Sequence, residues 1–250
     1  MRIKESVRNI KAIFKRELKN YFSSPVAYVF IIIFLLLLGF FTFNIGMFFE
    51  NNLADLKGFF DWHPWVFIFL IPAVSMRLWA DDRRLGTIEL VLTLPVTVTE
   101  AILGKFIAAW CFIGICLLFT FPMVLTVLYL GNPDIGASIF AYLGSILLAG
   151  AFLSVGIMTS SMTKNQVISF ILSVVICMFF ILAGYPPVLD ILYGWSPAWL
   201  VNTVSELSFL NHFYSIERGV LDIRDLLYYF SVIVFFLFVT GVIIQNRRAT

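Results

Sequence analysis

The sequence predicts an all-α integral membrane protein with six transmembrane helices, and three observations support that prediction. Hydrophobic residues make up 61% of the 250-residue chain, whereas charged residues make up only 13%. A soluble domain carries roughly 25% charged residues because its surface must be solvated. The charges are gathered between long uncharged segments, and these segments have the length that crosses a bilayer. The chain is therefore predicted to lie in a membrane.

The first element is a basic amphipathic helix predicted over residues 1–22. Its apolar residues recur at helical spacing and form one stripe, made of Ile3, Val7, Ile10, Phe14, Leu18 and Tyr21. Seven Lys and Arg residues fill the other faces. A helix of this kind lies in the headgroup plane, with its stripe buried and its cations near anionic lipid. We therefore expect an interfacial helix.

Six largely uncharged segments predict the spans, at about 25–48, 62–80, 99–130, 136–160, 165–185 and 226–246. Ser24 and Pro25 predict where the first helix begins, because Ser caps a helix and Pro favours its first position. The segment 184–225 mixes prolines, tryptophans and charges. Since Trp favours the headgroup level, we expect short helices there in the outer leaflet.

The distribution of Lys and Arg predicts the orientation of these spans. With the N-terminus inside, the inner segments hold fourteen bases and the outer segments three. Cytoplasmic loops carry such an excess. Both termini and the loop between the second and third spans are therefore predicted to be cytoplasmic, and the segment 184–225 is predicted to face outward.

The loop between the second and third spans is the exceptional part of the sequence. Residues 76–110 hold four acids and four bases between two apolar segments. A short amphipathic helix is predicted at about 84–94, ended by Pro95. Thr97 and Glu100 then match a capping box that starts the third span. This segment could be a short helix that enters a groove on a partner protein. Alternatively, it could be a solvated loop whose charges only enforce the topology of the spans.

Several function classes find no support in the sequence, and we predict no catalytic, cofactor-binding or metal-binding residues. The three cysteines lie in apolar runs without a CxxC pair, and His63 and His212 are far apart, so we expect interfacial polar histidines. No GxxxxGK[ST] phosphate loop is present, and neither are the motifs of an intramembrane protease. Ionisable residues sit near span ends, which disfavours an ion-coupled transporter. A passive membrane anchor or assembly factor stays open.

Two segments carry a resemblance to a known family. The segment 77–110 resembles the cytoplasmic loop of ABC-2 type permeases, through Gly86, Thr87 and Glu89, then Pro95, then Gly104 and Lys105. The segment 207–231 resembles the end of the last external loop in the gliding-motility-associated permeases and those of nitrous-oxide-reductase maturation. This second match consists of His212, Phe213, Arg218, Gly219, Val220 and the residues 222–225.

The resemblance implies a permease subunit of the bacterial inner membrane that exports its cargo. Such subunits pair with a second permease copy or a homologous permease, and each sits on a cytoplasmic ATPase subunit that binds ATP and Mg. A periplasmic partner is a further candidate, and nucleic acid is not expected. The helix at 84–94 would be the coupling helix, with Arg84, Leu85, Gly86, Thr87, Glu89 and Leu90 as ATPase-coupling residues. The expected external motif is His212, Phe213, Arg218, Gly219 and Asp222.

Overall fold

The computed structural model describes residues 2–50, 54–86, 96–194 and 196–246, and the regular elements within these residues are all helical. The predicted all-α class is confirmed. In chain order the elements are α1 (Arg2–Ser23), α2 (Pro25–Phe40), the π-helix η1 (Phe41–Ile45), α3 (Lys57–Phe60), α4 (His63–Ser75), α5 (Arg77–Arg84), α7 (Val98–Leu118), α8 (Phe121–Leu130), α9 (Ile135–Met162), α10 (Gln166–Leu182), α11 (Pro186–Tyr193), α12 (Ala198–Glu206), α13 (Phe209–Glu217) and α14 (Ile223–Asn246).

Five helical stretches among the described residues are long and apolar enough to cross a membrane. A sixth is reached if α10 and α11, which are bent by 68° at their junction, count as one broken span. A multi-pass membrane protein is thus supported. The count of six spans stays a prediction, because it depends on that bent pair.

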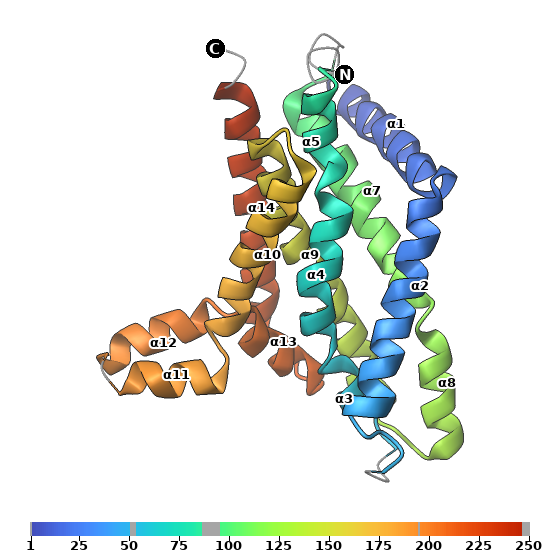
Figure 1. Ribbon diagram of the computed structural model, residues 1–250, viewed down its shortest axis with the longest axis vertical. Helices are drawn as coiled ribbons and strands as arrows, with labels where there is room; N and C mark the ends of the chain where they lie inside the picture. The colour runs from blue at the N-terminus through green and yellow to red at the C-terminus, as the bar shows by residue number, and fades with distance from the viewer. Residues whose placement is uncertain (1, 51–53, 87–95, 195, 247–250) are drawn as a thin grey trace.

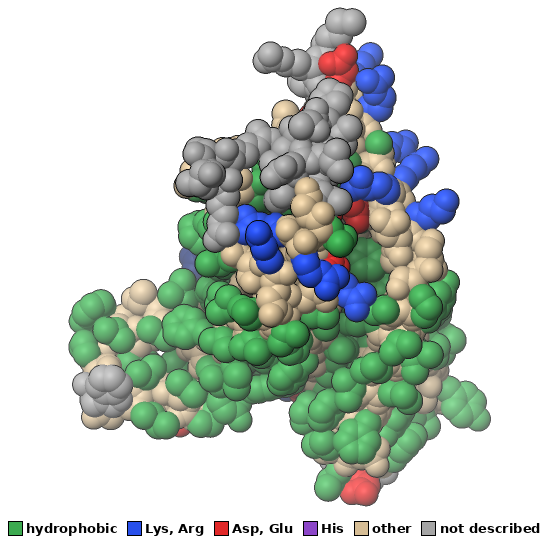
Figure 2. Space-filling view, turned by 45° about the horizontal axis from the view of Figure 1, so that its top comes forward, with side chains coloured by type: hydrophobic (Ala, Val, Ile, Leu, Met, Phe, Trp, Pro, Cys, Tyr) green, Lys and Arg blue, Asp and Glu red, His purple; other side chains and the backbone are tan. Residues whose placement is uncertain are grey.

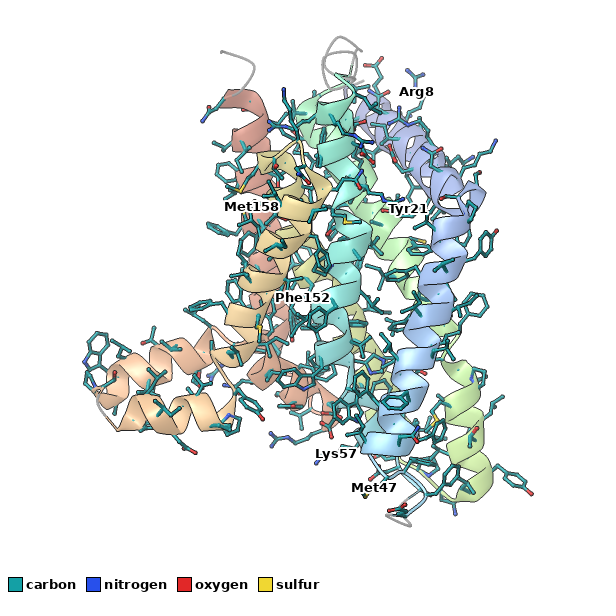
Figure 3. All side chains as sticks on the ribbon, viewed as in Figure 1. Arg8, Tyr21, Met47, Lys57, Phe152 and Met158 are labelled. Carbon is teal, nitrogen blue, oxygen red and sulfur yellow. The ribbon has the colours of Figure 1, made fainter. Side chains whose placement is uncertain are left out.

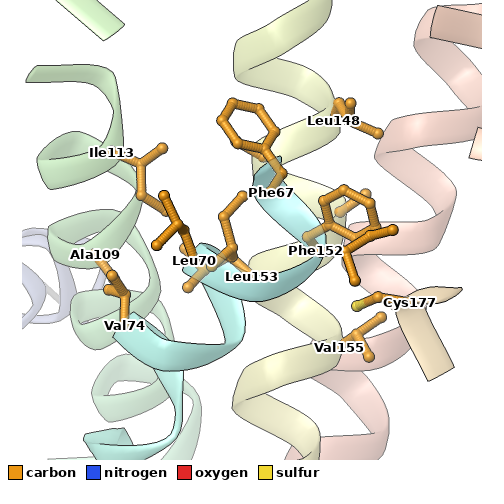
Figure 4. Close-up of a cluster of buried hydrophobic side chains, with 14 of the residues drawn as sticks. Phe67, Leu70, Val74, Ala109, Ile113, Leu148, Phe152, Leu153, Val155 and Cys177 are labelled. Atoms are coloured by element: carbon orange, nitrogen blue, oxygen red, sulfur yellow. The ribbon is translucent and has the colours of Figure 1, made fainter. Parts of the chain in front are cut away.

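Helix α9 is the centre of the bundle, and α4, α7, α10, α13 and α14 pack around it (Figure 1). Every residue of α9 from 148 to 161 is buried. Figure 4 shows the middle of this core, where Phe67 and Val74 of α4 lie beside Ile113 of α7 and Phe152 of α9. A helix that is apolar on all sides suits such a central position.

Local caps start several helices where the sequence predicts them. The Ser24 hydroxyl accepts a hydrogen bond from the Val26 N–H at 3.3 Å, and Pro25 is the first residue of α2. At the start of α9, the Asp134 carboxylate accepts a hydrogen bond from the Ala137 N–H at 3.0 Å, a cap that was not predicted. These side chains satisfy N–H groups that have no partner within the helix.

The third span, predicted at about 99–130, corresponds to the candidate membrane span Val98–Leu130, which is divided into two helices. Helix α7 ends at Leu118 and α8 begins at Phe121. At the break, the Thr120 hydroxyl donates to the Leu117 carbonyl at 2.6 Å and lies 2.8 Å from the Tyr142 hydroxyl. Pro122 has no N–H and suits the start of a new helix, so the break has a local cause.

The first two predicted spans also differ from straight helices. The first span changes from α2 to the π-helix η1 at Phe41 and ends at Ile45, short of residue 48. The second is divided at Met76 into α4 and α5. The second break matters for the site, because α5 leads directly into the loop that the sequence singles out.

The short helices predicted between residues 184 and 225 are present as α11, α12 and α13. Helices α11 and α12 project from the side of the bundle, and α11 buries no residue (Figure 1). Helix α13 instead buries Phe209, Leu210, Phe213 and Ile216. It therefore belongs to the protein core, which differs from the expectation of a helix lying in the outer leaflet.

His63 is not an interfacial residue as predicted. Its side chain is fully buried, its Nδ1 lies 3.2 Å from the Phe59 carbonyl oxygen, and Phe60 and Phe67 surround the ring. Phe60 and Phe67 are three and four positions from His63 in the sequence. That spacing places them on one helix face, but it does not indicate whether the face is buried or at the surface.

Candidate functional site

Most of the cationic side chains visible in Figure 2 gather at one end of the molecule, which we call the basic end, whereas Lys57 lies at the opposite end (Figure 3). The start of α1, the end of α5, the start of α7, the turn between α9 and α10, and the end of α14 all lie there (Figure 1). These are the segments that the charge count assigned to one side of the membrane. Their meeting at one end is what that assignment requires.

The predicted ATPase-coupling residues fall at the edge of the described structure. Arg84 is the last residue of α5, so it does not begin a new helix as predicted. Leu85 follows it, and Gly86 has a φ of +71°, a left-handed conformation that ends a helix and favours glycine. Thr87, Glu89 and Leu90 lie outside the described residues.

Helix α5, which leads into that segment, is held on its polar side by two neighbours. The Asp81 carboxylate accepts a hydrogen bond from the Gln166 side chain of α10. The same carboxylate oxygen lies 3.4 Å from the Arg84 guanidinium, one turn further along α5. Asp81 therefore links the last turn of α5 to the start of α10.

Lys105 is the hub of the site and was not among the predicted coupling residues. This lysine is 4% exposed, and its ammonium lies 2.7 Å from Asp82 and 2.6 Å from the Leu78 carbonyl oxygen. Glu17 of α1 lies 3.6 Å away, and the Trp79 ring centroid lies at 5.0 Å. An ammonium group has three donors and no acceptor, so these oxygens suit it. One side chain of α7 thus joins α1 and α5.

Helix α1 lies directly on α7 beside this hub. A Cβ on Gly104 would come within 2.7 Å of the Ile13 side chain, so the glycine permits the close approach. One turn earlier, the Asn9 amide donates to Glu100 at 3.2 Å. Glu100 also completes the predicted capping box with Thr97, which is confirmed. The start of α7 is therefore fixed both by its own cap and by α1.

This docking changes the expected setting of α1. Asn9 and Glu17 face α7, and Tyr21 stacks on Phe112 at 4.9 Å between ring centroids. Val7, which belongs to the predicted apolar stripe, is 59% exposed. The helix thus presents a mixed polar and apolar face to α7. Only the exposed part of its apolar stripe, which includes Val7, can contact lipid.

The joint between α4 and α5 is held by α9. The Ser160 hydroxyl accepts hydrogen bonds from the N–H groups of Trp79 and Ala80 at 3.0 and 3.1 Å, and it donates to the Met76 carbonyl at 2.9 Å. The first N–H groups of α5 have no partner within that helix, so a hydroxyl from α9 satisfies them. Any displacement of α5 must strain this contact or carry α9 with it.

The external motif is a structural joint between α13 and α14. His212 Nδ1 lies 2.6 Å from the Asp225 carboxylate, its Nε2 lies 3.1 Å from the Glu206 carbonyl oxygen, and its ring stacks on Tyr228 at 3.9 Å. Within the described residues no group of three or more metal-ligating side chains is found. With Asp225 at Nδ1 and the Glu206 carbonyl at Nε2, both ring nitrogens of His212 have protein partners.

The other residues of the motif shape the turn after α13. Phe213 is fully buried, and Arg218 donates from Nε to the Tyr214 carbonyl. Gly219 has a φ of +82°, and Asp222 accepts a hydrogen bond from the Arg224 N–H at 2.9 Å. The turn predicted at Arg218 and Gly219 is thus present and leads into α14.

Glu217, next to this turn, is expected to make stability depend on pH. It is 6% exposed, and burial, reinforced by the Asp61 carboxylate, raises its pKa from 4.5 to about 8, against the opposing charges of Lys57 and Arg218. Between these values the folded chain holds a proton that the unfolded chain has lost, so stability falls as pH rises from about 4.5 to about 8. Glu217→Gln removes this dependence.

The measurement for Glu217 is the unfolding temperature at pH 5 and pH 8.5. We expect Glu217→Gln to lose less of its stability between the two values than the unmodified chain does. Glu206→Gln is the control, since Glu206 is exposed on α12. Equal losses in all three proteins would contradict the prediction.

Comparison of the sequence with known families identifies the family of this chain. Residues 11–245 match the model of a family described as ABC-2 family transporter protein. The chain belongs to the ABC-2 transporter family. A search of curated proteins finds no match. Membership makes this chain a multi-pass membrane subunit of the ABC transporter class and implies an ATPase partner, while the narrower likeness to the gliding-motility and nitrous-oxide permeases stays a prediction.

In this ABC-2 subunit, four residues of the site were not among the predicted coupling residues: Lys105, Asp82, Glu17 and Ser160. A signal for Lys105 was present, because Gly104 and Lys105 belong to the motif that resembled the family. No sequence pattern indicated that Ser160, 81 residues after Trp79, would cap α5.

Proposed function

We propose that this chain is the permease subunit of an exporter and that a separate cytoplasmic ATPase drives it through the segment at 84–94. The basic end would face the cytoplasm of a bacterial inner membrane, with both termini there. The observation that supports this most is Lys105, which joins α1, α5 and α7 immediately before that segment.

The arrangement suits the transmission of force. A push on the residues after Gly86 would act on α5, whose contacts reach α7 through Lys105, α9 through Ser160 and α10 through Gln166. Packed helices move as units, because their interfaces do not deform continuously. The bundle would therefore respond as a whole to a movement of the ATPase.

The outer faces of the bundle leave room for the proposed second permease copy. Helix α2 buries Ala27, Phe34 and Leu38, whereas Ile32, Leu36 and Phe40 on the same helix are exposed. Helix α14 likewise exposes Phe230, Phe235 and Phe238. Such faces suit lipid or another copy of the chain.

We expect two substitutions to separate the permease from ATP hydrolysis. Gly86→Pro should uncouple transport, because proline cannot adopt the φ of +71° found there. Glu89→Arg should do so by reversing a charge in the proposed contact. The measurement is the ATPase activity of the purified complex in proteoliposomes, together with the yield of the complex.

Matched controls make the coupling test specific. Gly86→Asn should keep activity, since Asn tolerates the left-handed conformation, and Glu206→Arg reverses a charge on α12, away from the basic end. Unchanged activity and yield in Gly86→Pro and Glu89→Arg would refute the coupling role. If no ATPase subunit co-purifies with the unmodified chain, the alternative is favoured, namely a non-transporting anchor or assembly factor.

A further inference from the structure

A cavity of about 700 Å³ lies at the basic end, between the corner of α1 and α2 on one side and α4 and α5 on the other. Figure 2 shows the surface hollowed on this face, beside the cationic side chains. Its walls are of two kinds. The charged residues are Arg16, Glu17, Arg77, Asp81, Asp82 and Lys105. The apolar wall includes Val26, Ala27, Phe30, Val74 and Phe112.

The acids that line this cavity have cationic neighbours. Glu17 lies 2.8 Å from Arg16, Asp82 lies 2.7 Å from Lys105, and Asp81 faces Arg84 outside the cavity. Arg77 differs. It is exposed at the start of α5 and makes no hydrogen bond or ion pair within the part of the chain that the structure describes. A cation available for a ligand therefore lies at the mouth of the cavity.

Tyr21 also lines the cavity. The Tyr21 hydroxyl is buried and has no hydrogen-bond partner among the described residues. The ring points inward from α1, toward α7, and stacks on Phe112 (Figure 3). The ring therefore adds to the apolar wall, whereas the hydroxyl has almost no surface open to the cavity.

We propose that this cavity binds a glycerophospholipid, with its phosphate on Arg77 and its acyl chains against the apolar wall. A guanidinium matches phosphate oxygens with two parallel hydrogen bonds. The acyl chains would follow the apolar wall of Val26 and Phe30 along α2 into the bilayer. A small phosphate ion, which has no acyl chains, would leave the apolar wall in contact with water.

The charges near the mouth favour one class of headgroup. Asp81 and Asp82 line the same cavity as Arg77. These carboxylates would repel a second anionic group on the lipid, whereas they would attract an ammonium group next to the phosphate. The ligand class that fits is therefore phosphatidylethanolamine, and the site is independent of ATP and of the function proposed above.

The test is native mass spectrometry of the full-length chain in mild detergent, titrated with phosphatidylethanolamine. Arg77→Gln is expected to weaken binding on the order of ten-fold, as the loss of a charge-assisted hydrogen bond would. Arg8→Gln is the matched control, because Arg8 is exposed on α1 and does not line the cavity (Figure 3). It is expected to bind as the unmodified chain does.

A second variant and two further ligands complete the test. Val26→Trp should fill the apolar wall and weaken lipid binding while Arg77 is kept. Phosphatidylglycerol should bind more weakly than phosphatidylethanolamine, and glycerol phosphate should not compete at equal concentration. The proposal is overturned if Arg77→Gln binds the lipid like Arg8→Gln, if Val26→Trp has no effect, if phosphatidylglycerol binds more tightly, or if glycerol phosphate displaces the lipid.

Discussion

Lys105→Met is expected to destabilise the protein by about 3 kcal/mol and to release α1 from the bundle. The substitution leaves Asp82 without its 2.7 Å partner and weakens the hold on Glu17, and both carboxylates are largely buried. Removing one member of a buried pair costs about 3–5 kcal/mol, because the remaining charge stays in a poor solvent. The lower figure applies here, since the Asp82 side chain is 24% exposed.

Two measurements check the Lys105 prediction. Thermal unfolding in detergent should shift to lower temperature, and limited trypsin digestion should cleave the α1 region faster. Lys15→Met is the control, because Lys15 is exposed on the same helix. The double substitution Lys105→Met with Asp82→Asn should recover part of the loss, since it removes the Asp82 charge together with the Lys105 charge. Equal behaviour of the Lys105 and Lys15 variants would show that the hub is dispensable.

Gly156→Ala is expected to push α9 away from α4. An added Cβ would lie 1.9 Å from the Ser75 hydroxyl oxygen and 2.7 Å from the Ser75 Cβ. The hydroxyl could rotate, but the Cβ is fixed to the backbone of α4. Overpacking of this kind costs about 1–3 kcal/mol. The shift would reach the site, because Ser160, one turn further along α9, caps α5.

The matched control for Gly156 is Gly114→Ala in α7. No atom lies within 4 Å of the Cβ that would be added there. Since Ala is favoured over Gly in a helix by about 1 kcal/mol, this variant should be neutral or more stable. Unfolding temperatures of the two variants should therefore move in different directions. Ser75→Gly combined with Gly156→Ala should restore stability, and failure to do so would refute the close-contact explanation.

Local interactions account for what could be predicted about the fold. The Ser24 cap and the capping box of Thr97 and Glu100 join residues only two or three positions apart, so sequence spacing was sufficient to find them. The break before α8 has a local cause in Pro122, at the start of that helix, although the residues around it are uncharged. Uncharged length indicates a span but does not indicate a straight helix.

The site depended on contacts over long separations. The Gly104 and Lys105 pair belongs to the motif that resembles the family, yet its physical role requires α1 and α5 to lie against α7 at these residues. His63 shows the same limit, since its burial is decided by the aromatic residues packed around it.

The sequence by itself determined that this protein is a helical membrane protein with its cations concentrated in a few segments. Those properties follow from composition and from the order of charged and uncharged residues, which no packing can alter. The tertiary structure alone decided that Lys105 meets Glu17 and Asp82, that Ser160 caps α5, and that a cavity of about 700 Å³ is lined by Arg77. The physical reason is that each of these depends on how helices distant in sequence pack together, and the pattern along a single helix does not encode its neighbours.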